Sequence, residues 1–148
     1  MKWHILLAFA AGLLIAADRP KKEDKGAKEL KRFQGQWLIV SIEIDGEEVS
    51  VEGWTATFKG NKVTYKTGKD SVEGTFSLDP TKKPKQIEVI LQLPDHKEQK
   101  HLGIYQLTGD MLTLFEGGKS RPNGFSTKAG RKGKSCRLIV FKRPKKDK

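Results

Sequence analysis

Residues Phe33–Val40 read Phe-Gln-Gly-Gln-Trp-Leu-Ile-Val, a Gly-x-Trp motif at the head of a long apolar run. Leu38, Val40, Ile42 and Ile44 share one alternating face of this run, whereas Trp37 and Ile39 begin on the other. Successive strand side chains alternate between faces, so this change indicates a bulge or a strand buried on both sides near its start. We expect this strand to open the folded domain.

Seven more runs of strand-like residues follow it at short intervals. Most alternate apolar with polar residues, and turn signals such as Asp45-Gly46 and Gly60-Asn61 separate them. The eight predicted strands are 37–44, 54–59, 62–66, 71–78, 87–93, 101–107, 111–116 and 137–143.

Eight strands in hairpin succession predict an all-β fold, an eight-stranded antiparallel up-and-down barrel. A short helical turn at Ala27–Arg32 is expected to precede it. A two-sheet sandwich is the main alternative. Closure is favoured because the hairpins are short and no Greek-key crossover is evident. A barrel of this size holds either packed side chains or one small ligand.

The Gly35-Gln36-Trp37 motif resembles the lipocalin signature. Longer segments resemble a lipocalin-like (calycin-type) domain family abundant in planctomycete bacteria, over about residues 30–143. These segments are Phe33–Trp37, Ile42–Gly46, Phe58–Lys62, Glu73–Pro80, Lys82–Ile87, Leu102–Leu107, Gly109–Leu112 and Arg121–Phe125. The resemblance implies a calycin-type barrel and an extracytoplasmic location, and it brings no established activity.

The resemblance also implies a structural role for three residues. In lipocalins the tryptophan of this motif lies at the closed end of the barrel, under a basic side chain from the last strand. Trp37 would therefore form the barrel floor, and either Arg137 or Arg143 would lie over its ring. Spacing alone does not choose between the two arginines.

The N-terminal residues predict export. Lys2 supplies a positive start, Ile5–Ala16 an apolar segment, and Ala16-Ala17 a small-residue cleavage site. The alternative is an uncleaved membrane anchor, which needs roughly 20 apolar residues. We expect a signal peptide over 1–17, a basic flexible leader over 18–29, the barrel domain over 30–143 and a basic tail over 144–148. The protein would then be periplasmic or secreted.

The 148-residue chain has 29 basic and 18 acidic residues, a net charge of +11, and one cysteine, Cys136. An intramolecular disulfide is therefore impossible, and the core alone must hold the domain. The basic residues lie mainly in loops and termini, which favours unspecific attraction to an anionic envelope polymer or a membrane surface. We expect no nucleic-acid binding, because the aromatic residues mostly fall at inward positions. A monomer is expected.

No catalytic constellation is legible, and we expect a non-enzymatic protein without cofactor or metal. His96 and His101 are expected to be solvated, because no further ligands complete a zinc pattern. The carboxylates are expected on outer strand faces.

Ligand binding is the leading functional hypothesis. Inward-facing residues that could line a cavity for a small apolar ligand are Trp54, Phe58, Tyr65, Phe76, Leu91 and Tyr105. In the long loop after Glu116, Phe125 is expected to plug one barrel end, with Arg121 paired to a carboxylate or stacked on a ring. The alternative for this loop is a lid over a ligand mouth. The alternative for the whole protein is an envelope module with a filled core.

Overall fold

The computed structural model describes residues 24–125 and 136–147. The predicted signal peptide, the first part of the leader and most of the long basic loop lie outside the described residues. No helix within the described ranges is long and apolar enough to cross a membrane.

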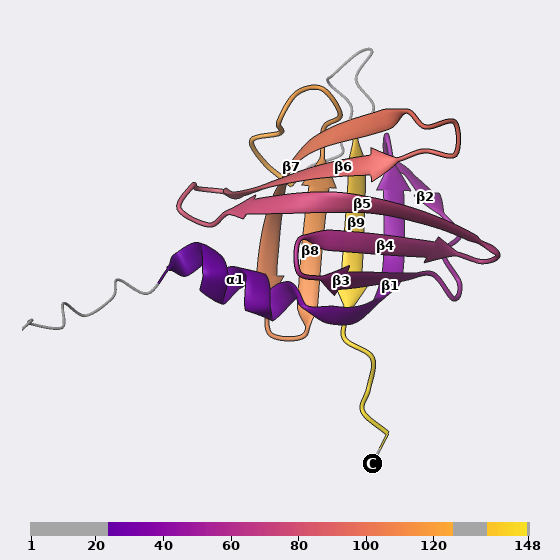
Figure 1. Ribbon diagram of the computed structural model, residues 1–148, viewed down its shortest axis with the longest axis horizontal. Coiled ribbons are helices and arrows are strands. Elements are labelled where there is room, and N and C mark those ends of the chain that lie inside the picture. Colours follow the sequence, from indigo (N-terminus) through magenta and orange to yellow (C-terminus); the bar gives the residue numbers. More distant parts are fainter. Residues whose placement is uncertain (1–23, 126–135, 148) are drawn as a thin grey trace, which may run out of the picture.

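The strands form one closed antiparallel barrel (Figure 1). Its order along the sheet is β2-β1-β3-β4-β5-β6-β7-β8-β9, and β9 pairs back with β1. The strands are β1 (Gly35–Ile44), β2 (Glu47–Val49), β3 (Thr55–Lys59), β4 (Lys62–Thr67), β5 (Asp70–Asp79), β6 (Lys85–Gln92), β7 (Glu98–Thr108), β8 (Met111–Glu116) and β9 (Arg137–Lys142). The β1–β9 pairing confirms the predicted barrel and excludes the sandwich.

β2 is the one strand that the sequence did not predict among those described. It is three residues long and forms a small hairpin with the end of β1. Because β3 pairs with the start of β1 and β9 with its later part, eight strands close the barrel and β2 adds to one edge.

The change of face in β1 comes from a bulge. The pairing of β1 with β9 shifts register between Ile39 and Ser41. An extra residue at this point lets Trp37, Ile39 and Ile42 all point into the core, although Ile39 and Ile42 are three residues apart. Of the two explanations offered by the sequence, a bulge or a strand buried on both sides, the structure shows the bulge.

Helix α1 (Lys25–Phe33) is longer than the single turn that was expected. The Asp24 side chain caps its start by accepting a hydrogen bond from the Gly26 amide at 3.0 Å. Lys31 and Arg32 lie in the last turn, where the helix dipole favours positive charge. Glu29 and Phe33, four residues apart, form the buried face of the helix.

Two glycines are required by close approaches. A side chain on Gly74 in β5 would place its Cβ 2.3 Å from the carbonyl oxygen of Ile90, so the strand there accepts only glycine without backbone movement. Gly35 has a φ of +98°, which favours glycine, and its Cβ position lies 3.1 Å from Nη1 of Arg143.

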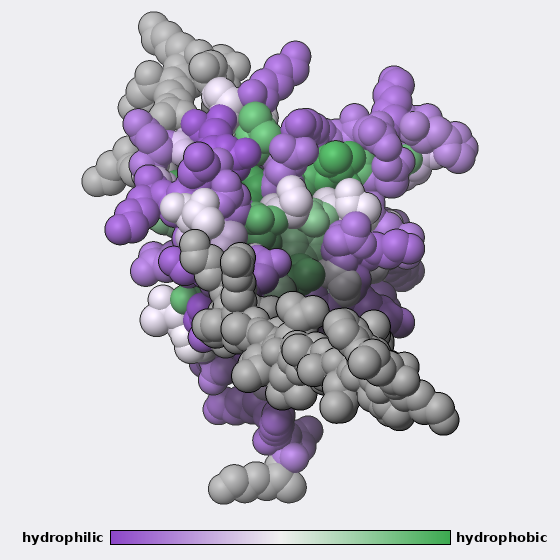
Figure 2. All heavy atoms as spheres, turned by 60° about the vertical axis from the view of Figure 1, so that its left-hand side comes forward, coloured by the Kyte–Doolittle hydropathy of each residue, from purple (hydrophilic) through white to green (hydrophobic). Residues whose placement is uncertain are grey.

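The outer face of the barrel is less uniformly polar than expected. Ile104, Phe115 and Cys136 form a second buried cluster with Leu138 beside it. These side chains alternate with the inward ones of β7, β8 and β9, so they lie on the outside of the sheet. On the face shown in Figure 2, hydrophilic side chains surround a smaller central area of apolar side chains.

Candidate functional site

Trp37 forms the floor at one end of the barrel, which we call the closed end. Its ring is fully buried, and the indole N–H donates to the carbonyl oxygen of Phe33 at 2.8 Å. Arg143 lies over the ring, with Cζ 3.8 Å from the ring centroid. Its Nη2 donates to the carbonyl of Arg32 at 2.7 Å and its Nη1 to that of Gln36 at 3.3 Å. The geometry therefore places Arg143, and not Arg137, over Trp37.

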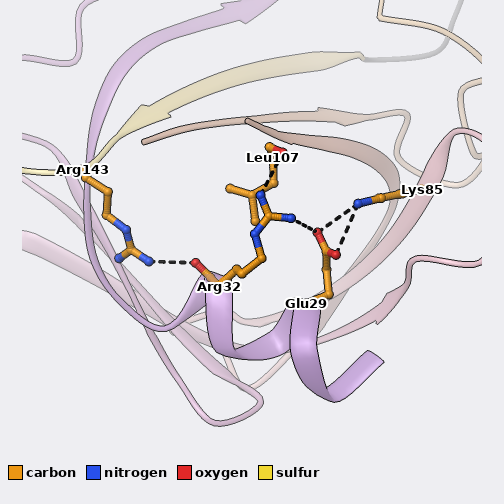
Figure 3. Close-up of polar contacts among 5 residues, drawn as sticks. All are labelled: Glu29, Arg32, Lys85, Leu107 and Arg143. Atoms are coloured by element: carbon orange, nitrogen blue, oxygen red, sulfur yellow. Dashed lines mark hydrogen bonds and ion pairs between the residues drawn. The ribbon is translucent and has the colours of Figure 1, made fainter. Parts of the chain in front are cut away.

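Ion pairs fasten α1 across the closed end (Figure 3). The carboxylate of Glu29 is buried and accepts from Lys85 Nζ at 3.1 and 3.2 Å and from Arg32 Nη1 at 3.2 Å. Arg32 Nη2 also donates to the carbonyl of Leu107 at 3.3 Å. This network joins α1 to β6 and to the end of β7, and its role is structural.

Aromatic side chains fill the closed half of the barrel. Phe33 projects from the end of α1 and contacts three rings, with centroids 5.4 Å away for Phe58, 5.8 Å for Phe76 and 5.1 Å for Tyr105. Three of the six predicted ligand-lining residues therefore contact Phe33, a helix residue. Their packing is typical of a core and leaves the other half of the barrel as the candidate site.

The remaining predicted lining residues are Tyr65, Leu91 and Trp54. Tyr65 and Leu91 are buried in the main core cluster, and Trp54 is half-buried beside it. Val72 lies directly opposite Tyr65 in the β4–β5 pairing and is also half-buried.

A group of polar side chains faces the interior beside these apolar residues. We call it the distal polar cluster and define it as Tyr65, His101, Glu116 and Arg137. Glu116 ends β8, where Leu112 and Leu114 are buried in the core, and Arg137 begins β9, where Ile139 and Phe141 are buried. Because side chains two apart share a strand face, Glu116 and Arg137 point inward too.

The position of this cluster follows from the direction of the strands. Arg137 opens β9, whereas Arg143 at the closed end follows its last residue. Glu116 and Arg137 are directly opposite in the β8–β9 pairing, just as Met111 and Lys142 are at the other end. The cluster therefore lies at the end of the barrel away from Trp37.

An ion pair between a buried carboxylate and a half-buried guanidinium is the centre of the cluster. The Glu116 side chain is 1% exposed and that of Arg137 is 30% exposed. Arg137 donates from Nε to Glu116 Oε2 at 2.9 Å and from Nη2 to the same oxygen. Both contacts use one carboxylate oxygen, so the other, Oε1, is left to other partners.

Three buried polar atoms of the cluster have no hydrogen-bond partner among the described residues. They are the Tyr65 hydroxyl, His101 Nε2 and Glu116 Oε1. His101 Nδ1 lies 3.9 Å from Glu116 Oε2, which is too far for a hydrogen bond. A buried polar atom without a partner costs about 1–3 kcal/mol, so three in one place indicate a bound molecule or bound water.

Burial favours the uncharged forms of two groups of the cluster, Tyr65 and His101. It raises the pKa of the Tyr65 hydroxyl, with the Glu116 carboxylate adding to the effect and Arg137 opposing it. Burial also lowers the pKa of His101, against the opposing influence of Glu116. The cluster therefore places an uncharged phenol and an uncharged imidazole beside the Glu116–Arg137 ion pair.

Two sequence predictions about this region are corrected. The His101 side chain is 11% exposed rather than solvated, and Glu116 is an inward-facing carboxylate. Strand alternation carried a signal for both, because His101 shares the face of Tyr105 and Leu107, and Glu116 that of Leu112 and Leu114. His96, in contrast, is exposed as expected.

The loop after β8 also differs from its prediction. Arg121 Nη1 donates to the carbonyl of Ile87 at 2.8 Å and to that of Gly103, in place of the expected carboxylate or ring. Phe125 is 36% exposed and so does not plug a barrel end. Arg121 borders a hollow of about 220 Å³ lined by residues of β5 and β6, smaller than the ~300–1,000 Å³ of ordinary ligand sites.

Metal chemistry has no candidate within residues 24–125 and 136–147. No group of three His, Cys, Asp or Glu side chains there could hold an ion.

Comparisons with known proteins place the fold. No protein-family model matches the chain. No curated protein matches it either. Among solved structures, it is similar to a mutant of LTBP1 in complex with leukotriene C4, with a TM-score of 0.53 and 14% identity over 80% of this chain and 71% of that chain. At this identity the likeness concerns the fold alone, and the fold is lipocalin-like.

Proposed function

We propose that this protein binds one small amphiphilic molecule in the distal half of its barrel. The polar group of the ligand would contact the distal polar cluster, and its apolar body would lie against Trp54, Val72 and Leu91. The observation that carries the proposal is the set of three buried polar atoms without partners beside the Glu116–Arg137 pair. A ligand that satisfies them would offset a large part of their desolvation cost.

The structural neighbour supports an apolar body for the ligand. LTBP1 was solved with leukotriene C4, so a barrel of this kind accepts a lipid. In this chain the half-buried Val49, Val51, Trp54 and Val72 pack against the main core cluster, and Val72 lies directly opposite Tyr65. The proposed protein is an exported, non-enzymatic binding module, as the N-terminal export pattern favours.

The proposal is tested with an uncharged fluorescent probe, N-phenyl-1-naphthylamine, titrated into the purified protein. We expect saturable binding of one equivalent. Val72→Trp should weaken it at least about tenfold by filling the distal interior. Glu73→Trp is the matched control, because Glu73 is the next residue of β5 and is exposed on the opposite face.

Circular dichroism and thermal unfolding of both variants show whether each is folded. Absence of saturable binding by the wild-type protein would contradict the proposal. So would a folded Val72→Trp variant that binds the probe like Glu73→Trp.

A second candidate function is an envelope module that docks through basic loops and tail. It is favoured by the filled closed half, where Phe33 packs against Phe58, Phe76 and Tyr105, and by the net charge of +11. Removing 144–148 would then weaken cosedimentation with anionic envelope material at low salt. Cosedimentation that neither the deletion nor added salt reduces would argue against this function.

A further inference from the structure

The distal polar cluster has a balance of charge that restricts what it can bind. The positive charge of Arg137 is directed at Glu116 through both of its contacts, Nε and Nη2. Burial disfavours the charged forms of Tyr65 and His101. The buried group is therefore electrically neutral as a whole, and any charged ligand group would enter it without a counter-ion.

The unpartnered atoms also differ in the kind of hydrogen bond they need. Glu116 Oε1 can only accept, and the Tyr65 hydroxyl can donate. The Nδ1 side of His101 faces the Glu116 carboxylate, which favours the proton on Nδ1 and leaves Nε2 as an acceptor. The cluster thus offers two acceptors and one donor to the interior.

Resting on the proposed function, we infer that the ligand carries an uncharged polar group that both donates and accepts hydrogen bonds. A hydroxyl or a primary amide on an apolar body has this chemistry. It would donate to Glu116 Oε1 or His101 Nε2 and accept from the Tyr65 hydroxyl. The site thereby selects a long-chain alcohol or amide over a fatty acid, a phosphate ester or an amine.

Charged groups fail on two counts. A carboxylate or phosphate can only accept, so it leaves Oε1 and Nε2 unsatisfied and brings a second negative charge next to Glu116. An ammonium group can only donate, so it leaves the Tyr65 hydroxyl without an acceptor and lies near Arg137. Juxtaposed like charges are strongly unfavourable in a buried site.

The test compares three ligands that share one apolar chain: 1-decanol, decanoate and decylammonium. Each displaces N-phenyl-1-naphthylamine from the purified wild-type protein near neutral pH. We expect 1-decanol to displace the probe at a concentration at least about tenfold lower than either charged ligand needs. Decanamide should behave like 1-decanol.

Glu116→Gln provides a sharper test. The substitution removes the counter-ion of Arg137 and leaves a net positive site. The ratio of the affinity for decanoate to that for 1-decanol should therefore rise by at least about tenfold. Glu73→Gln, which removes an exposed carboxylate from the outer face of β5, should keep the wild-type order of affinities. If Glu116→Gln does not fold, the wild-type comparison decides alone.

The outcomes separate this inference from the proposed function. Probe binding with decanoate or decylammonium preferred, or with no preference, overturns the inference and leaves the proposed function in place. Absence of probe binding overturns the proposed function and, with it, the inference. Probe binding with 1-decanol preferred supports both.

Discussion

Trp37 shows how one residue of the opening motif organises its surroundings. Its N–H donates to the carbonyl oxygen of Phe33 at the end of α1. The guanidinium of Arg143, which follows β9, lies over its ring. Gly35 leaves room for that guanidinium and takes a φ of +98° where the helix gives way to β1. The Gly-x-Trp motif therefore connects the helix, the first strand and the end of the last strand through direct contacts.

Replacing Arg143 by Met should destabilise the protein by about 1–2 kcal/mol, because the cation–π contact and two hydrogen bonds to backbone carbonyls are lost. Urea unfolding followed by tryptophan fluorescence measures the change. Lys142→Met is the control, since Lys142 is exposed at the end of β9. Equal stability of the two variants would mean that Arg143 does not hold the closed end.

His101 should make stability fall in mild acid. Its pKa is lowered by burial from an ordinary 6.5, so the unfolded chain binds a proton more readily than the folded one. This contribution is fully present above 6.5 and is lost as the pH falls toward the lower folded pKa. Among its charged neighbours, Glu116 raises the pKa of His101 and Arg137 lowers it.

Accordingly, His101→Asn should show a smaller loss of unfolding free energy than the wild type as the pH is lowered through this window. His96→Asn, at an exposed position, should retain the wild-type slope. Identical slopes for all three proteins would show that His101 is not buried in its neutral form.

At the residue scale, sequence reasoning reached Trp37 and a choice of two arginines but not the distal polar cluster. The alternation of β8 and β9 places Glu116 and Arg137 inward, yet their pairing depends on a register set across a loop. The three unpartnered atoms are a property of three-dimensional packing, which no spacing along the chain shows.

Helix α1 acts as an element that closes the barrel rather than as a leader. Phe33 is fully buried among three rings, and Glu29 ties the helix to Lys85 of β6. Gln34 continues the attachment, accepting from the Gly60 amide at 2.6 Å and donating to its carbonyl at 3.0 Å. The helix thus connects to the β3–β4 turn, β6 and the end of β7.

Phe33→Ala should cost about 3–5 kcal/mol of unfolding free energy, because it leaves a cavity among Phe58, Phe76 and Tyr105. Lys31→Ala, on the exposed side of the helix, should change it by less than about 0.5 kcal/mol. Thermal and urea unfolding give both values. A loss for Phe33→Ala as small as that for Lys31→Ala would contradict the role of α1 in closing the barrel.

The strands were predictable to the extent that they alternate. The runs at Lys62–Lys66 and Ser71–Leu78 correspond to β4 and β5 within a residue at each end, because one face of each is buried. β7 begins at Glu98, three residues before the predicted start of the strand at His101, because its backbone pairs with β6 as far as Gln92. Backbone pairing of exposed residues leaves no apolar pattern to read.

At the scale of the whole molecule, the barrel interior divides into two halves with different chemistry. The closed half holds Trp37, Phe33 and the aromatic rings packed around them, whereas the distal half carries the Glu116–Arg137 ion pair and three of the unpartnered polar atoms. The sequence predicts one set of lining residues for the whole interior, because alternation shows which face of a strand a side chain occupies but not where it lies along the barrel axis. We therefore expect the closed half to stabilise the fold and the distal half to bind the proposed ligand.

The most direct test is a titration of the protein with 1-decanol followed by nitrogen–proton correlation NMR of its arginine and histidine side chains. The two ends of the barrel supply their own controls, because Arg137 and His101 belong to the distal polar cluster while Arg143 lies over Trp37 and His96 is exposed. We predict saturable shifts of the Arg137 and His101 signals with those of Arg143 and His96 unchanged. Shifts confined to Arg143, or no saturable shift at any of the four, would contradict a ligand site in the distal half.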